Sequence, residues 1–111
     1  MPIFISQGRF SQSAMKGMVA RPEDRAEEVT KLVERAGGKL LGYYVTFGQH
    51  DFLVIIDMPG TRETAAAVIA AAAGGGVADM TTVPAMTSAE AKQVFADAAK
   101  LAQSFRPAGA S

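Results

Sequence analysis

Apolar and polar residues alternate in four short stretches of the chain, and such alternation is typical of β-strands with two distinct faces. The strands predicted in this way span residues 3–10, 39–47, 51–58 and 77–86. Pro84 lies inside the last stretch and has no backbone N–H to donate. We therefore expect that strand at an edge of the sheet.

Two segments between the strands show apolar residues at helical spacing. One helix is predicted to have Pro22 at its first position and to end at Gly37-Gly38. Another is predicted to run from an N-cap at Thr61 to about Ala73, where three glycines follow. Residues 11–20 are interpreted as a connector with room for a helical turn.

The helix best marked in the sequence follows the last strand. Thr87 with Glu90 three positions later forms a capping-box pattern, so a helix is predicted over residues 88–105. Its apolar residues make one continuous stripe: Ala91, Val94, Phe95, Ala98, Leu101, Ala102 and Phe105. Residues 106–111 are expected to form a flexible tail.

This order of elements predicts the fold. Right-handed crossovers turn two interlocked βαβ units into a ferredoxin-like α+β fold, βαββαβ, with an antiparallel four-stranded sheet and both main helices on one face. A chain of 111 residues has room for one core. We therefore expect a single domain over residues 1–105, which includes the additional C-terminal helix.

The central hairpin assigns side chains to two faces. Gly48-Gln49 fits a two-residue loop with glycine at the first central position of a type II′ turn, which places Val45 opposite Phe52 and Tyr44 opposite Leu53. One face then carries Leu41, Tyr43, Val45, Phe47, His50, Phe52, Val54 and Ile56. The other face carries Leu40, Gly42, Tyr44, Thr46, Asp51, Leu53, Ile55 and Asp57.

The first of these faces is almost entirely apolar and should lie under the two main helices. The second is mixed but still holds leucine, isoleucine and tyrosine, and soluble monomers rarely leave such a patch bare. We therefore expect a homo-oligomer, most simply a homodimer formed by sheet-on-sheet packing about a two-fold axis. The C-terminal helix is the alternative cover, and it could instead pack at the sheet edge or on the partner.

Composition narrows the classes of partner. Eleven basic residues balance eleven acidic ones, so we expect no nucleic-acid partner. The chain has no cysteine and one histidine, so we expect no metal site and no cofactor. The apolar run at residues 64–78 is shorter than the about 20 residues of a membrane span. The first residues do not resemble a signal peptide, and we expect a cytoplasmic protein with no membrane partner.

A candidate ligand site lies near the mouth of the hairpin. Tyr44, Thr46 and Asp51 gather there on the mixed face and would need partners or a ligand. If Gln7 and Arg9 point to the same face, Arg9 could pair with Asp51 or hold an anionic ligand. The alternative is a solvated strand end.

His50 completes the set of candidate ligand-binding residues. His50 and Asp51 are sequence neighbours on a strand, so they point to opposite faces and are poorly placed to act as a base and its orienting partner. The simpler interpretation is that His50 sits at a loop end and Asp51 accepts hydrogen bonds from turn N–H groups. No catalytic residue is assigned.

The residues also resemble a known family. A Met1-Pro2 opening, the run Tyr44 to Asp51 (YVTFGQHD), Asp57-Met58-Pro59 and the Thr82 to Met86 strand end are similar to the GYD domain family of small bacterial proteins. His50 stands where the tyrosine of that family is expected. The resemblance implies a dimeric α/β-barrel in which two ferredoxin-like sheets enclose a cavity. Function in the family is largely unassigned.

Three functions fit the sequence. The first is a homo-oligomeric module that binds a small molecule, in a regulatory role or otherwise, in the cavity between its sheets. The second is a cofactor-independent enzyme of the dimeric-barrel kind, such as a monooxygenase or isomerase, using His50, Tyr44 or Asp51. The third is a purely structural assembly domain. A single histidine and the lack of cysteine favour the first over the second.

Overall fold

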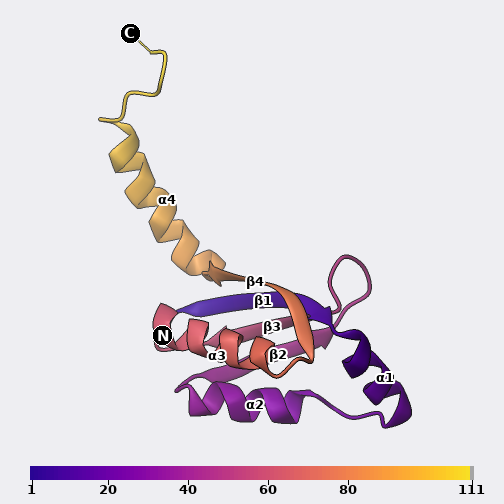
Figure 1. The fold of residues 1–111 in the computed structure, drawn as a ribbon. Helices are drawn as coiled ribbons and strands as arrows, with labels where there is room; N and C mark the ends of the chain where they lie inside the picture. The colour runs from indigo at the N-terminus through magenta and orange to yellow at the C-terminus, as the bar shows by residue number, and fades with distance from the viewer. Residues whose placement is uncertain (111) are drawn as a thin grey trace.

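The computed structural model describes residues 1–110 and contains four strands and four helices (Figure 1). The strands are β1 (Ile3–Phe10), β2 (Lys39–Val45), β3 (Phe52–Asp57) and β4 (Val77–Ala85). The helices are α1 (Gln12–Ala20), α2 (Ala26–Arg35), α3 (Thr61–Ala73) and α4 (Ser88–Ala102). Ser111, the end of the expected tail, lies outside the described residues.

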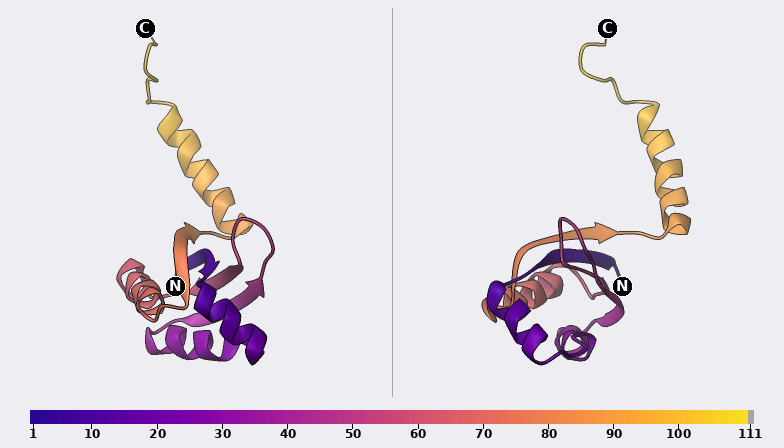
Figure 2. Two further views of the ribbon diagram at one scale, coloured as in Figure 1. Left: turned by 45° about the vertical axis from the view of Figure 1, so that its right-hand side comes forward. Right: turned by 90° about the vertical axis from the view of Figure 1, so that its right-hand side faces the viewer.

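The four strands form one sheet in the order β2-β3-β1-β4, with every neighbouring pair antiparallel. Helices α2 and α3 lie on the same side of this sheet (Figure 2). Both features confirm the ferredoxin-like α+β fold predicted from the sequence. Strand β4 is at an edge, as the position of Pro84 requires.

We call the side of the sheet under α2 and α3 the helix face. Its core consists of the buried residues Phe4, Val33, Phe52, Val54, Ile56 and Met58. Gly8 is needed here, because a Cβ at this position would lie 2.7 Å from the ring of Phe52. The apolar periodicity of β1, β3 and α2 therefore builds one contiguous core.

We call the opposite side the open face, and the strand register defines it. It comprises Ile3, Ile5 and Gln7 of β1, Lys39, Gly42 and Tyr44 of β2, Leu53, Ile55 and Asp57 of β3, and Thr81, Val83 and Ala85 of β4. Directly opposed residues share a face, so these side chains form rows across the sheet. No helix of the described chain covers them (Figure 2).

A β-bulge corrects one part of the expected register. Leu40 pairs with Ile56, but Gly42 pairs with Ile55, so Leu41 is an extra residue in β2. Because side chains alternate, the extra residue reverses the faces on its far side. The assignment of Leu40 to the mixed face was wrong, since Leu40 packs against the core. Leu41, expected over the core, is 46% exposed.

The hairpin loop is also longer than expected. The pairs Val45–Phe52 and Tyr44–Leu53 are confirmed, but the two strands end at Val45 and Phe52. The N–H of Thr46 donates to the carbonyl of Asp51, and the Thr46 hydroxyl donates to the carbonyl of His50. In a two-residue loop the N–H of Phe47 would pair with this same carbonyl of His50. Phe47 is 97% exposed and packs on neither face.

The starts of three helices differ from the prediction; for α3, the N-cap is Gly60 and not Thr61, which is the first residue of the helix. Residues 12–20 form a complete helix, α1, because the Ser11 hydroxyl caps it by accepting from the N–H of Ala14. Helix α2 begins at Ala26 and not at Pro22. The carboxylate of Asp24 accepts from the N–H of Ala26, which places the start of the helix after the two acidic residues Glu23 and Asp24.

Helix α4 projects away from the rest of the chain (Figures 1 and 2). The predicted capping box is present, with the Thr87 hydroxyl accepting from the N–H of Glu90, but the helix ends at Ala102 and not at 105. None of its residues is buried. The radius of gyration is 18.0 Å, against about 13 Å for a compact domain of this length.

Candidate functional site

The hairpin residues predicted as a site are held together by backbone hydrogen bonds. A carboxylate oxygen of Asp51 accepts from the N–H of Phe10 at 2.9 Å, and the N–H of Asp51 donates to the carbonyl of Gly8. Asp51 therefore joins the start of β3 to the end of β1. The Thr46 hydroxyl donates to the carbonyl of His50 at 2.9 Å. These polar groups close the loop, as turn residues commonly do.

Gln7 and Tyr44 lie in one row across the open face, with Leu53 between them. Tyr44 is 59% exposed, and its ring lies over Gly42, where a Cβ would be 3.1 Å from the ring. Arg9 is exposed, and no ion pair joins it to Asp51. The ion pair between Arg9 and Asp51 is therefore not formed among the described residues, and Gln7 and Tyr44 lie on the uncovered side of the sheet.

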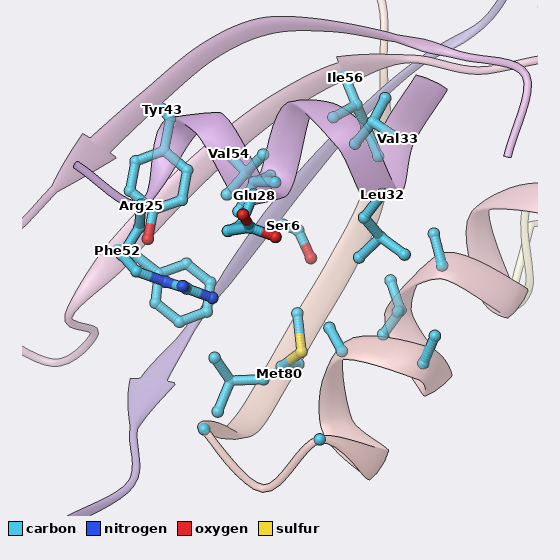
Figure 3. Close-up of a pocket in the computed structure, with 18 of the residues that line it drawn as sticks. Ser6, Arg25, Glu28, Leu32, Val33, Tyr43, Phe52, Val54, Ile56 and Met80 are labelled. Carbon is cyan, nitrogen blue, oxygen red and sulfur yellow. The ribbon is translucent and has the colours of Figure 1, made fainter. Parts of the chain in front are cut away.

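A pocket of about 360 Å³ lies on the helix face, between the sheet, α2 and α3 (Figure 3). We call it the helix-side pocket. Tyr43, Phe52 and Arg25 gather at one end in Figure 3, and Leu32, Val33 and Ile56 lie at the other. This pocket is within one chain, whereas the cavity expected from the sequence lies between two sheets.

The composition of α3 explains the pocket. The helix sequence is TRETAAAVIAAAA, and its sheet-facing positions include Ala67 and Ala71. A methyl group is too short to reach the side chains of α2, such as Leu32, across the space above the sheet. Cores are normally filled to crystal-like density, so a run of small residues at this contact leaves a hollow.

An aromatic wall borders the pocket. The rings of Phe10 and Phe52 are 5.2 Å apart, and the rings of Tyr43 and Phe52 are stacked at 6.3 Å. Burial raises the pKa of the Tyr43 phenol; nearby Arg25 lowers it in part, and Asp24 raises it further. The phenol therefore stays protonated at neutral pH and can donate a hydrogen bond.

The floor of the pocket carries a polar group with spare capacity. Ser6 is only 4% exposed, and its hydroxyl lies 2.7 Å from the hydroxyl of Thr82. One of the two hydroxyls donates to the other, and that leaves the accepting hydroxyl's own proton without a partner among the described residues. Ser6 lines the pocket and Thr82 does not, so the Ser6 hydroxyl offers a ligand either its proton or a free lone pair, depending on which of the two donates.

Two residues of opposite charge, Arg25 and Glu28, line the pocket from the start of α2; Figure 3 shows Arg25 by Tyr43 and Phe52, and Glu28 nearer the middle, by Ser6 and Val54. The guanidinium of Arg25 is 3.5 Å from Glu23, and the carboxylate of Glu28 is 3.2 Å from Lys31. Both pairs are substantially exposed, and exposed pairs contribute little to stability. Arg25 and Glu28 both line the pocket, but they are not paired with each other.

Sequence reasoning missed Ser6, Arg25, Glu28 and Tyr43 as lining residues. Tyr43 was assigned to the correct face, but only as a core residue. The signal that could have found the pocket is the alanine run of α3, set against the larger apolar residues of α2. Taken alone, this run predicts only a helix that ends at glycine.

Neither a metal centre nor a membrane span is found in the part of the chain that the structure describes. No group of three or more histidine, cysteine, aspartate or glutamate side chains within residues 1–110 is arranged to hold a metal ion. None of the described helices is long and apolar enough to cross a membrane.

Taken together, the sheet order and the placement of α2 and α3 define a ferredoxin-like α+β domain. The family model for the GYD domain matches residues 4–95, and the chain belongs to the GYD domain family. This match confirms the resemblance found in the sequence. No curated protein and no solved structure matches the chain.

Proposed function

We propose that this protein is a homo-oligomeric small-molecule-binding module. In this proposal the open face and α4 are the surfaces through which copies associate, and the helix-side pocket holds the ligand. The observation that carries the proposal is the division of one sheet into two sides: a largely apolar side that no helix within residues 1–110 covers, and a covered side with a pocket of about 360 Å³.

The exposed area supports association. The accessible surface of the chain is 7926 Å², whereas a compact monomer of 11.6 kDa exposes roughly 5,800 Å². The excess is about 2,000 Å². A stable interface takes about 800 Å² from each partner. Burying the open face and one side of α4 against a second copy would remove this excess.

Helix α4 supports the same conclusion by a separate argument. Isolated helices of about 15 residues are marginal in water, so most need an apolar face to pack against something. Among residues 1–110 nothing buries the apolar stripe of α4, with Phe95 74% and Leu101 71% exposed. A second copy supplies the missing surface.

The pocket supports the binding role. It falls within the range of about 300–1,000 Å³ that is typical of small-molecule sites, and it combines apolar walls with a few polar groups. The enzyme alternative gains no support from the hairpin, where the Asp51 carboxylate bonds to the N–H of Phe10. A cavity between paired sheets stays a prediction about the assembly.

Two measurements test the proposal. Sedimentation or light scattering at micromolar concentration should give a mass at least twice that of one chain, and a clean monomer would contradict the assembly. A thermal-shift screen of metabolites should find a compound that raises Tm by mass action. A broad screen with no hit would contradict the binding role and leave the structural assembly function.

A further inference from the structure

We propose that the helix-side pocket binds a small zwitterion with one apolar, ring-sized arm, the chemistry of an aromatic α-amino acid. This inference rests on the proposed function, because it names the ligand class of the same pocket. The carboxylate of the ligand would meet Arg25, its ammonium would meet Glu28, and its apolar arm would lie against the ring of Phe52 and extend toward Met80.

The size of the pocket sets the size of the arm. A dry protein cavity of about 150 Å³ accepts benzene, and the helix-side pocket is about 360 Å³. One ring with a short polar head fits this volume. The wall of stacked aromatic rings, Phe10, Phe52 and Tyr43, favours a flat apolar arm over a polar one.

The charges select the head group. Arg25 and Glu28 lie three residues apart on α2, so they are neighbours on one face of the helix. A simple anion would be attracted by Arg25 and repelled by Glu28. A simple cation would be attracted by Glu28 and repelled by Arg25. A head group with both charges satisfies both side chains at once.

Both charged side chains are free to change partners. Glu23 and Lys31, their present partners, are more than half exposed, so exchanging them for a ligand costs little. The protonated Tyr43 phenol lies at the same end and can donate to the carboxylate. The third charged lining residue, Arg35, is ten residues further along α2, about 15 Å away, and lies outside this head-group site.

The test compares three probes of one size by titration calorimetry at pH 7. L-Phenylalanine carries both charges, 3-phenylpropionate lacks the ammonium, and 2-phenylethylamine lacks the carboxylate. L-Phenylalanine should bind about tenfold tighter than either analogue, because hydrogen bonds to charged groups contribute that much. Equal binding of all three would overturn the zwitterion assignment.

Charge-removing variants assign each end of the ligand. Arg25→Gln should abolish the advantage of L-phenylalanine over 2-phenylethylamine, and Glu28→Gln should abolish its advantage over 3-phenylpropionate. Arg62→Gln and Glu27→Gln are the matched controls, because neither residue lines the pocket, and both should bind like wild type. Unchanged selectivity in Arg25→Gln and Glu28→Gln would overturn the proposed contacts.

A filling variant locates the site. Ala71→Leu places a larger side chain in the pocket and should reduce L-phenylalanine binding at least about tenfold, whereas Ala72→Leu, exposed on the same helix, should not. If Ala71→Leu does not fold, NMR contacts between ligand ring protons and the Met80 methyl of the wild-type protein serve the same purpose. Contacts to Tyr44 and not to Met80 would contradict this location.

The two levels of the proposal can fail separately. If the metabolite screen finds a ligand that Ala71→Leu excludes, but none of the three probes binds, the zwitterion class is wrong and the binding module stands. If no compound binds at all, the zwitterion class and the small-molecule-binding role are both wrong.

Discussion

The two faces of the sheet come from the same four strands, yet they differ in what meets them. On the helix face, Phe52 and Ile56 are at most 4% exposed, and they pack under two helices. On the open face, the equally apolar Leu53 and Ile55 are only partly buried, by their neighbours in the sheet. Hydrophobicity alone therefore does not determine which face of the sheet is buried within the chain.

The helix face also differs from the open face in packing, because the space between the sheet and the two helices is not completely filled by side chains. The alanines of α3 leave a pocket above a well-packed layer of strand residues, and that pocket holds the polar groups of Ser6, Tyr43 and Arg25. The open face has a continuous surface with large aliphatic side chains in adjacent rows. A hollow suits a small ligand, whereas a continuous apolar surface suits a second protein surface.

Removing the central ring of the helix face should have the greatest effect. Phe52→Ala should lower the free energy of unfolding by about 3–5 kcal/mol, because the ring is buried and lies against Phe10 and Tyr43. Urea denaturation at fixed protein concentration measures this. Phe47→Ala is the control and should change the stability of the chain by less than about 0.5 kcal/mol. Similar losses in both variants would contradict the assignment of the core.

Charging the open face should break the assembly without unfolding the chain. Ile55→Asp should weaken association about 100-fold or more, since it would bury an unpaired carboxylate between two sheets. Analytical ultracentrifugation measures the dissociation constant. Ile69→Asp makes the same change at an exposed position of α3 and should leave association unchanged. An Ile55→Asp variant that associates like wild type would remove the open face from the interface.

Asp51 joins β1 to β3 at the end of the sheet next to the hairpin loop. Asp51→Ala should cost about 2 kcal/mol, because the N–H of Phe10 loses a charged acceptor. Thr46→Val removes a neutral hydrogen bond to the carbonyl of His50 and should cost about 1 kcal/mol. Chemical denaturation distinguishes them, and a larger loss for Thr46→Val would contradict the role given to Asp51.

The smallest effect concerns the start of α4. Hydrogen bonds from the backbone and side chain of Thr87 lower the pKa of Glu90. A carboxyl group whose pKa is lowered in the folded state stabilises that state at pH values above the unfolded pKa. This contribution to stability is lost as the pH falls through the lowered pKa. Helicity at 222 nm should therefore fall slightly on acidification. Glu90→Gln should lack this part of the pH dependence, and identical titration curves would contradict it.

Much of the fold could be predicted from the sequence, because local patterns determine it. Alternation identified the strands, Pro84 identified an edge, and the Thr87–Glu90 pair identified the start of α4. The bulge at Leu41 could not be predicted in this way, because one extra residue changes the face without changing the composition of the strand. The length of the hairpin loop could not be predicted in this way either, since the hydrogen bond from the Thr46 hydroxyl to the carbonyl of His50 leaves no mark in the alternation of the strands.

The pocket could not be located from local patterns at all. Ser6, Arg25 and Tyr43 come from β1, the start of α2 and β2, and only the tertiary packing brings them to one hollow. The hairpin candidates were prominent in the sequence because polar residues cluster there. In the structure the polar groups of Thr46 and Asp51 are occupied by backbone partners.

The length of α4 limits what it can reach. Its 15 residues span about 22 Å, and a four-stranded sheet measures about 14 Å from its first strand to its last. One such arm can cross the whole width of a single neighbouring sheet, but it cannot extend over a second one. If each of two chains laid its α4 across the sheet of the other, both helices would be packed, and neither apolar stripe would remain available to bind further copies.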